Sequence, residues 1–250
     1  MRLKRQTVLL TGATGAIGQA IARELASDGA RVVLQFRSDA SKAGALAKEL
    51  GHGAMALPAD LSDPASPTAL WQAAEDAAGR IDTLINNAGI LTPSSVDQSL
   101  EDWHRVWHGD LQVNLMAAAD LCRAAVRHFL GRGGGRIVNI ASRAAQGGYR
   151  AEAMSYGATK AALVNLTQSI ARGFGPSGVT AVAIAPGWVK TEMSDAYVRE
   201  HGAAAALSGI PVGRMATPEE IAELVAFVLR PSQTSLSGAV LDVNGASQMR

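Results

Sequence analysis

The stretch Arg5-Gln-Thr-Val-Leu-Leu-Thr11-Gly-Ala-Thr-Gly-Ala-Ile-Gly18 decides the fold of this 250-residue chain. Its apolar part predicts a short buried strand at residues 7–10. A glycine-rich turn follows at once, and residues 19–28 predict a helix. Glycines let backbone N–H groups come close to a phosphate, and the positive end of a helix dipole favours its charge. The stretch therefore predicts a binding site for the pyrophosphate of a nucleotide cofactor.

Short apolar runs alternate with amphipathic segments along the rest of the chain. Strands are predicted at residues 7–10, 32–36, 54–57, 83–85, 136–140, 179–184 and 240–243. Helices are predicted at residues 16–28, 41–50, 64–78, 100–129, 155–174 and 218–229. Continuous apolar strands between amphipathic helices indicate a parallel sheet covered on both faces. We therefore expect an α/β fold of about seven strands, in one domain over residues 1–250.

A tyrosine and a lysine stand four residues apart in Ser155-Tyr-Gly-Ala-Thr-Lys160. On a helix this spacing puts both side chains on one face, within reach of each other. An ammonium beside a phenol favours the phenolate and lowers its pKa, so the phenol becomes a usable acid and base. The ordinary alternative is an exposed helical pair. Ser142, which directly follows the apolar run at residues 136–140 and Ala141, places a hydroxyl at a predicted strand end.

Read together, these features resemble the single-domain short-chain dehydrogenase/reductase family, of the type with a Tyr-x-x-x-Lys catalytic motif. The likeness covers essentially the whole chain. It rests on motifs in the family's order: Thr11 to Gly18, Asp60-Leu61, Asn86-Asn-Ala-Gly89, Asn114, Ser142, Tyr156 with Lys160, Pro186-Gly-Trp-Val-Lys-Thr191, residues 214–222 and Asp242-Val-Asn-Gly245. The resemblance implies a Rossmann-type, doubly wound sheet whose ligands bind at the carboxyl ends of the strands.

The resemblance also implies a catalytic tetrad of Asn114, Ser142, Tyr156 and Lys160. In it Lys160 lowers the pKa of Tyr156 and bonds the nicotinamide ribose, Ser142 donates to the carbonyl oxygen, and Asn114 holds a water. No catalytic metal is implied. The residues expected to bind the cofactor are Gly12, Thr14, Gly15, Ala16, Ile17, Gly18, Arg37, Ser38, Asp60, Leu61, Asn87, Ala88, Gly89, Tyr156, Lys160, Pro186, Gly187, Val189 and Thr191.

The end of the second predicted strand favours NADP(H) over NAD(H). Sites for NAD carry an acid about 20 residues past the glycine turn, whereas an arginine accommodates the 2′-phosphate of NADP. Phe36 stands where relatives that use NAD carry aspartate, and Arg37 and Ser38 follow it with a cation and a hydroxyl suited to a phosphate. Asp39 also lies near the expected distance and is the main argument for NAD(H).

Composition and charge limit the choice of partners and location. A net charge of +1 gives no sign of a nucleic-acid or membrane surface. No apolar run has the length of a membrane-spanning helix, and the run after Met1 stops at the glycine turn, so no signal peptide is expected. Cys122 is the one cysteine, as suits a protein of the reducing cytoplasm. His104 and His108 have metal-ligand spacing but no third ligand, so we expect no metal site.

The substrate pocket is the least determined part of the sequence. Fourteen residues separate Ser142 from Tyr156, one more than is usual in relatives, so the shape of the loop between them cannot be borrowed. Tyr149 in that loop has no lysine four residues later and is a candidate to line the pocket mouth. The segment 192–211, with its run of alanines, predicts a mobile lid.

Three functions are consistent with the sequence. The first is an NADP(H)-dependent ketone reductase resembling 3-oxoacyl-carrier-protein or carbonyl reductases, with an acyl carrier among its possible partners. The second is an NAD-dependent dehydrogenase of a sugar, polyol or steroid-like alcohol. The third is a cofactor-binding regulatory protein without turnover. By the same resemblance, we expect a homotetramer built on the two long helices and on the C-terminal strand.

Overall fold

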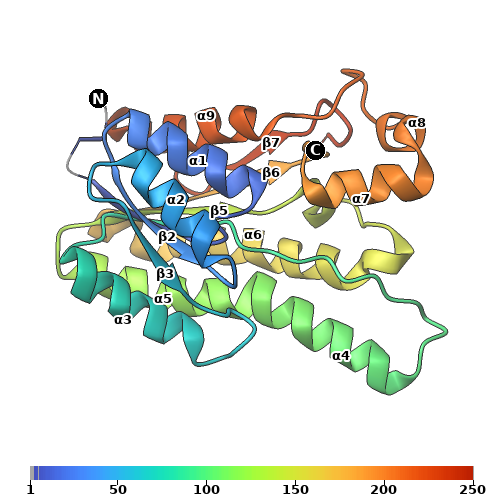
Figure 1. Ribbon diagram of the computed structural model, residues 1–250, viewed down its shortest axis with the longest axis horizontal. Coiled ribbons are helices and arrows are strands. Elements are labelled where there is room, and N and C mark those ends of the chain that lie inside the picture. The colour runs from blue at the N-terminus through green and yellow to red at the C-terminus, as the bar shows by residue number, and fades with distance from the viewer. Residues whose placement is uncertain (1–2, 5, 250) are drawn as a thin grey trace.

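Seven parallel strands form one twisted sheet in the computed structural model, which describes residues 3–4 and 6–249 (Figure 1). The order is β3-β2-β1-β4-β5-β6-β7, so the doubly wound α/β prediction is confirmed. The strands are β1 (Thr7–Leu10), β2 (Arg31–Phe36), β3 (Met55–Pro58), β4 (Thr83–Asn86), β5 (Gly135–Ile140), β6 (Val179–Pro186) and β7 (Val240–Val243). The central strands β1 and β4 are buried along their full length, which explains why most of their residues are apolar.

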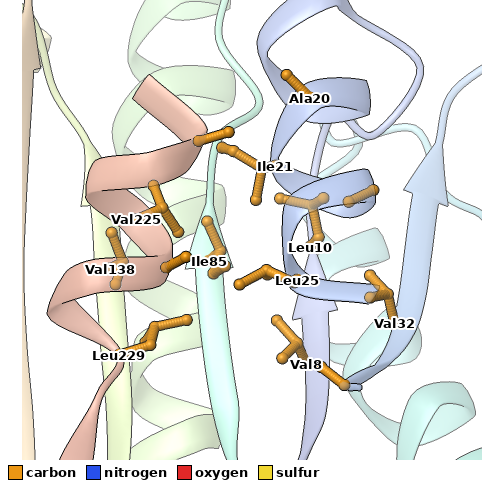
Figure 2. Packing of buried hydrophobic residues seen from close by; sticks show 14 of the residues in the cluster. Val8, Leu10, Ala20, Ile21, Leu25, Val32, Ile85, Val138, Val225 and Leu229 are labelled. Atoms are coloured by element: carbon orange, nitrogen blue, oxygen red, sulfur yellow. The ribbon is translucent and has the colours of Figure 1, made fainter. Parts of the chain in front are cut away.

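Helices cover both faces of the sheet (Figure 1). On one face lie α1 (Ala16–Ser27), α2 (Ala40–Leu50) and α9 (Pro218–Val228). On the other lie α3 (Ser66–Ala78), α5 (Ala117–Leu130) and α6 (Met154–Phe174). Figure 2 shows the first face, where Ile21 and Leu25 of α1 and Val225 and Leu229 at α9 meet over the strands. Burial of such side chains stabilises the fold by about 1.5–3 kcal/mol each.

The helix predicted at residues 100–129 is divided in the structure. It consists of α4 (Leu100–Leu111), a π-helical turn (Gln112–Met116) and α5. A π-helical turn has one residue more than an α-helical turn, and such turns occur frequently at functional sites. Asn114 lies within this turn, so the irregularity coincides with a predicted site residue.

The chain reverses its direction of sheet building between β1 and β4, at the centre of the sheet. Ligands of open α/β sheets bind in the crevice at this point, outside the carboxyl ends of the strands. Asn87 follows β4 and Gly187 follows β6 directly, whereas Gly12 and Ser142 lie two residues after β1 and β5. The parallel topology therefore brings predicted site residues from the whole chain to one edge.

The segment expected to form a lid is helical, a feature that the sequence analysis did not predict. It contains α7 (Glu192–His201) and α8 (Ala203–Leu207). Thr191 caps α7 through a bond from the backbone N–H of Ser194 to its hydroxyl. Ala206, Ile210 and Met215 form a small buried cluster against which Trp188 and Tyr197 pack. The segment thus has its own apolar anchor, and its mobility stays a prediction.

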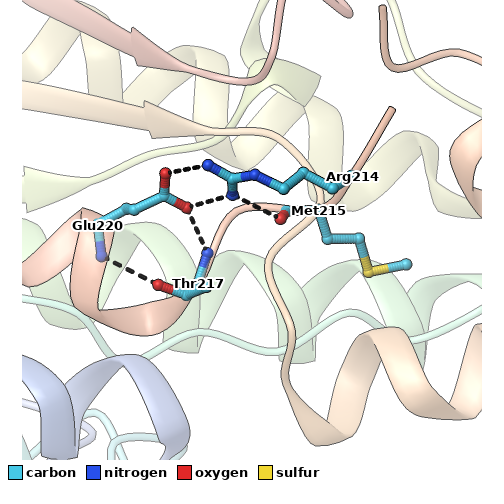
Figure 3. Close-up of polar contacts among 4 residues, drawn as sticks. All are labelled: Arg214, Met215, Thr217 and Glu220. Atoms are coloured by element: carbon cyan, nitrogen blue, oxygen red, sulfur yellow. Dashed lines mark hydrogen bonds and ion pairs between the residues drawn. The ribbon is translucent and has the colours of Figure 1, made fainter. Parts of the chain in front are cut away.

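A polar cluster holds the start of α9 (Figure 3). The Arg214 guanidinium donates two bonds of 2.8 Å to the carboxylate of Glu220, which also accepts the backbone N–H of Thr217. The Thr217 hydroxyl in turn accepts the N–H of Glu220, which completes a capping box. One residue earlier, Ala216 forms a β-bridge with Val189: its N–H donates to the Trp188 carbonyl and its carbonyl accepts the Lys190 N–H, so this cluster anchors the segment after β6.

None of the helices in the described ranges has both the length and the apolar character needed to cross a membrane.

Candidate active site

The glycine turn after β1 is packed too tightly for side chains at two positions. Gly12 has a φ of +64°, and a Cβ there would lie 2.9 Å from the Cα of Ala88. A Cβ at Gly18 would lie 2.2 Å from the carbonyl oxygen of Gly12. The turn is therefore packed closely against both α1 and the residues after β4.

Amide and hydroxyl side chains fix the turn to its neighbours. The Thr11 hydroxyl accepts the backbone N–H groups of Asn87 and Ala88, both at 3.0 Å. The Asn87 amide donates back to the carbonyl oxygens of Thr11 and Gly12. These reciprocal bonds join the ends of β1 and β4 at the crevice.

Gln35 of β2 completes this frame and was missed by the sequence analysis. Its side chain is only 3% exposed. Its Oε1 accepts the Gly12 N–H at 2.7 Å, and its Nε2 donates to the Ala59 carbonyl at 2.7 Å. The available signal was a lone polar residue inside the apolar run Val32–Phe36, where a buried amide needs partners.

The start of α1 fits the pyrophosphate of a dinucleotide. Gly15 is its N-cap and supplies no side-chain cap, and the first turn of α1 contains no acidic residue. The N–H groups of the first helical turn have no partner within a helix, and they carry the positive end of its dipole. One cavity is lined by the residues of this turn and of the start of the helix, which are Thr14, Gly15, Ala16, Ile17 and Gly18. A glycine at the cap leaves a bulky anion room to approach.

Arg37, Ser38 and Asp39 at the end of β2 have different surroundings. Arg37 lines the cavity and is close enough to Asp60 to lower the pKa of that carboxyl, although bonds from the N–H and hydroxyl of Ser62 lower it more. Ser38 is exposed and lies off the cavity wall. Asp39 accepts the N–H of Lys42 and caps α2, so its carboxylate already serves the helix.

Ser142, Tyr156 and Lys160 meet where β5 ends against α6. All three line the cavity. The Lys160 ammonium donates to the carbonyl of Ile140 at 2.8 Å and lies 5.7 Å from the centroid of the Tyr156 ring. The Ser142 hydroxyl accepts the backbone N–H of Ala144 at 3.1 Å and lies close enough to the Tyr156 phenol to lower its pKa. The ring of Tyr149 lies 6.0 Å from that of Tyr156, so Tyr149 lines the cavity as expected.

The pKa of Tyr156 differs in direction from the sequence-based expectation. Burial, together with smaller contributions from the charges of Tyr149 and Asp110, raises it to about 12 against the lowering effect of Ser142. Burial also lowers the pKa of Lys160, which is 3% exposed, to about 8. The sequence predicted that Lys160 would lower the pKa of Tyr156. This prediction is wrong for the net pKa in the protein, because burial disfavours the charged forms of both groups.

Asn114 is 1% exposed and does not line the cavity. Its Oδ1 accepts the Ile90 N–H at 2.8 Å, and its Nδ2 donates to the Ile90 carbonyl and the Thr159 hydroxyl. The Thr159 hydroxyl donates to the carbonyl of Tyr156. Asn114 therefore connects the π-helical turn, the loop after β4 and the backbone of Tyr156.

Asp110 of α4 is a second residue that sequence reasoning missed. It is completely buried, and its Oδ2 accepts the hydroxyl of Ser155 at 2.7 Å. Ser155 immediately precedes Tyr156, so this bond ties α4 to α6 beside the phenol. No motif spacing links the two residues in the sequence, and only the packing of α4 against α6 reveals the contact.

One continuous cavity of about 960 Å³ contains nearly all of the predicted site. Its glycine-turn half is lined by Gly12, Thr14, Gly15, Ala16, Ile17, Gly18, Gln35, Arg37, Asp60, Leu61, Asn87, Ala88 and Gly89. Its aromatic half is lined by Arg143, Tyr149, Arg150, Trp188 and Tyr197. Between them lie Ser142, Tyr156, Lys160, Pro186, Gly187, Val189 and Thr191. Of the residues predicted to be catalytic or to bind the cofactor, only Ser38 and Asn114 do not line the cavity.

The aromatic half was not predicted beyond Tyr149. The Arg150 guanidinium carbon lies 4.7 Å from the ring centroid of Tyr197, 5.4 Å from that of Tyr149 and 5.8 Å from that of Trp188. The rings of Trp188 and Tyr197 lie 4.7 Å apart. Contacts between an arginine and ring faces stabilise a wall that contains few hydrogen bonds. Within the described residues, no group of three or more potential metal ligands occurs.

Comparison with known proteins identifies the family. A family model described as Enoyl-(Acyl carrier protein) reductase matches residues 12–246. The 3-oxoacyl-[acyl-carrier-protein] reductase of Vibrio harveyi is 34% identical over 249 residues, which cover 100% of both chains. A short-chain dehydrogenase of Burkholderia cenocepacia, solved with NADP, is 35% identical with a TM-score of 0.89 over 99% of both chains. A 3-ketoacyl-(acyl-carrier-protein) reductase of Brucella melitensis, complexed with NADH, is 30% identical with a TM-score of 0.87 over 99% of this chain and 100% of that one.

The chain therefore belongs to the short-chain dehydrogenase/reductase family. Members of this family are oxidoreductases that act on hydroxyl and keto groups with NAD(P), and this chain is such an enzyme. The cavity agrees with that class, because it joins a cradle for a dinucleotide to a phenol, an ammonium and a hydroxyl. The cofactor is a nicotinamide dinucleotide of the NAD(P) type.

Proposed function

We propose that the protein is an NADP(H)-dependent reductase of a ketone, working reversibly on the secondary alcohol. The observation that carries this proposal is one cavity that holds the glycine turn together with Ser142, Tyr156 and Lys160. When bound, the nicotinamide supplies the hydride and takes it back in the reverse reaction. The protein then has to bind the carbonyl group, supply a proton to its oxygen and exclude competing water from the site.

Tyr156 is the proton donor in this proposal. With a pKa of about 12, its phenol keeps the proton near neutral pH, which suits the direction of reduction. The Ser142 hydroxyl holds the developing negative charge on the carbonyl oxygen, a contribution of about 3 kcal/mol. Lys160 binds cofactor hydroxyls and returns a proton to Tyr156, and its pKa of about 8 fits a group that exchanges protons readily. Asn114 holds the backbone of Tyr156 in place through Thr159.

The preference for NADP(H) rests on Arg37. It lines the glycine-turn half, whereas Asp39, the candidate acid for NAD, is engaged as the N-cap of α2. A guanidinium matches the geometry and charge of a 2′-phosphate. Arg37→Asp should reverse the preference, measured as the ratio of Kd values for NADPH and NADH. A wild-type protein that binds NADH more tightly would contradict the assignment.

Turnover of a panel of ketones and secondary alcohols with both cofactors tests the reaction itself. We expect ketone reduction with NADPH to have the highest kcat/KM. Tight NADPH binding without turnover of any carbonyl or alcohol would favour the cofactor-binding regulatory protein instead. Faster alcohol oxidation with NAD than with NADP would favour the NAD-linked dehydrogenase. The similarity to 3-oxoacyl-carrier-protein reductases makes acyl carrier thioesters part of this panel.

We further propose a cytoplasmic homotetramer. Ala158, Ala161 and Asn165 are exposed along α6, and small exposed residues permit close approach of a second helix. β7 is an edge strand of the sheet, and a closed assembly with two-fold axes covers such an edge. Light scattering should give about four times the chain mass of 25.9 kDa, and a mass near 25.9 kDa at micromolar concentration would exclude the tetramer.

A further inference from the structure

Two arginines stand in the aromatic half of the cavity, and both come from the loop that precedes α6. Arg143 directly follows Ser142, and Arg150 follows Tyr149. Both line the cavity and both are partly buried. Rings form much of the remaining wall, and the acidic side chains that also line it are Glu152, Glu192 and Glu200.

The two arginines differ in what already holds their charge. Arg150 forms an ion pair with Glu152, with 3.2 Å between Nε and Oε1, and it is surrounded by the rings of Tyr149, Trp188 and Tyr197. Its charge therefore serves to hold the wall together. The Arg143 guanidinium instead lies near the Trp188 ring, with its carbon 6.0 Å from the centroid. In the part of the chain that the structure describes, no carboxylate lies within ion-pair distance of Arg143.

The other charged groups on this part of the wall do not neutralise Arg143. Glu200 pairs with His201 on α7, with 3.9 Å between the atoms, and both are exposed. Glu192 is exposed in the first turn of α7, where the helix dipole favours it. Lys160 carries the same sign of charge and donates to a backbone carbonyl. The wall next to Ser142 thus presents an uncompensated positive charge.

We propose that the carbonyl substrate carries an anionic oxo-acid group, a carboxylate or a phosphate, that Arg143 binds. A guanidinium offers a planar fork of donors that matches either group with two parallel bonds. A partly buried cation without a counter-ion is costly to keep, and an anionic ligand removes that cost. The Trp188 ring limits the positions of the side chain, so less freedom is lost on binding.

The location of Arg143 separates this role from cofactor binding. The proposed site for a 2′-phosphate is Arg37, which lies beside Asp60 in the glycine-turn half. Arg143 instead belongs to the aromatic half, where Trp188 packs on Tyr197 of α7. This inference rests on the proposed function, because it takes Ser142 and Tyr156 as the carbonyl-binding pair.

Matched pairs of ketones test the inference with the full-length protein and NADPH. One pair is 5-oxohexanoate and its methyl ester, and the other is hydroxyacetone phosphate and hydroxyacetone. In the wild type we expect the anionic member of at least one pair to have a kcat/KM higher by roughly 10- to 100-fold, the range of a charge-assisted bond. The pair that shows this preference distinguishes carboxylate from phosphate.

Variants assign the preference to one side chain. Arg143→Gln should abolish the preference for the anionic ketone, because kcat/KM should fall for that ketone alone. The kcat/KM for the neutral ketone and the Kd for NADPH should stay within about threefold of the wild-type values. Arg143→Lys should keep part of the preference, because the charge remains without the fork. Arg172→Gln, at an exposed arginine near the end of α6, is the matched control and should leave it intact.

Two results would overturn the inference: a wild type that prefers neither anionic ketone, or a preference that survives in Arg143→Gln. If the wild type reduces none of the four ketones, thermal stabilisation decides. The NADPH complex should then be stabilised more by 5-oxohexanoate or hydroxyacetone phosphate than by methyl 5-oxohexanoate or hydroxyacetone. If Arg143→Gln loses this difference, the Arg143 site is supported even though the proposed reaction has failed. Equal stabilisation by both members would reject it.

Discussion

The two halves of the cavity are held by different kinds of contact. In the glycine-turn half, hydrogen bonds from Thr11, Gln35 and Asn87 fix backbone groups at the ends of adjacent strands. In the aromatic half, rings of Trp188 and Tyr197 pack around Arg150 on loops and on α7. The first arrangement fixes one geometry for a constant ligand. The second leaves a wall whose shape depends on a few exchangeable side chains, as a varying substrate requires.

The largest expected effect lies between the halves, at Tyr156. Tyr156→Phe removes the proton donor but keeps the ring, so kcat should fall by about 10³-fold while NADPH binding persists. Steady-state kinetics and a fluorescence titration of NADPH measure the two quantities. Tyr149→Phe removes the neighbouring hydroxyl and should cost less than about tenfold in kcat. Comparable losses in both variants would contradict the role of Tyr156.

Breaking the hydrogen-bonded half should affect stability and cofactor binding together. Gln35→Leu leaves the Gly12 N–H and the Ala59 carbonyl without their partners, at a cost of about 2–4 kcal/mol in the free energy of unfolding. The displaced turn should also raise the Kd for NADPH by about tenfold or more, the equivalent of roughly 1.4 kcal/mol. Urea unfolding and a binding titration test both effects.

Gln72→Leu, at an exposed position of α3, is the control for Gln35→Leu and should change stability by no more than about 0.5 kcal/mol. If Gln35→Leu destabilises the protein but binds NADPH with unchanged affinity, the buried amide supports the sheet and not the turn.

The same contrast explains which parts of the protein the sequence predicted. All seven strands and the glycine turn were expected, because continuous apolar runs and closely spaced glycines are local signals. The boundaries differ by one or two residues, as at β3, where the strand begins at Met55 instead of residue 54. Ser142, Tyr156 and Lys160 were placed together correctly, because a strand end and a helical spacing of four fix their positions.

Other features depend on contacts between distant segments and gave no local signal. The bond from Ser155 to Asp110 joins residues 45 positions apart, and the charge of Asp110 contributes to a Tyr156 pKa opposite to the expected direction. The π-helical turn interrupts a sequence whose helical pattern continues through it. Arg150 meets Trp188, which follows β6, and Tyr197 of α7, and both rings are distant from it in the sequence. Burial and packing, not spacing, determine all three.

Changes in the aromatic half should leave the other half intact. Tyr197→Ala removes the ring that lies 4.2 Å from His201 and 4.7 Å from Arg150. Losing these contacts should lower the free energy of unfolding by about 1–2 kcal/mol. The KM of the ketone should rise several-fold, whereas the Kd for NADPH should not change. Tyr197→Phe keeps the ring and is the control, so its KM for the ketone should equal that of the wild type. A change in the Kd for NADPH in Tyr197→Ala would show that the two halves of the cavity are coupled.

The smallest effect concerns the anchor behind the aromatic half. The Arg214 guanidinium and the Thr217 N–H lower the pKa of Glu220 from 4.5 to about 2, and the Ala216 N–H beside them donates to the Trp188 carbonyl. A carboxyl whose pKa is lower in the folded state stabilises the protein above its unfolded pKa, and this stabilisation is lost as pH falls from about 4.5 towards 2. Because the pair is largely exposed to solvent, the contribution is small.

Glu220→Gln should therefore lower Tm by only about 1–3 °C at pH 7, and the difference from the wild type should shrink below about pH 4.5 as the wild-type carboxyl gains its proton. Glu219→Gln, at the exposed neighbouring acid in the same helical turn, is the matched control and should show less of this pH dependence. A difference for Glu220→Gln that stays constant down to pH 3 would mean that shape, and not charge, holds the anchor. If KM for the ketone also rises in Glu220→Gln while NADPH affinity is unchanged, the Arg214–Glu220 pair supports the aromatic half alone, through the bond from the Ala216 N–H to the Trp188 carbonyl.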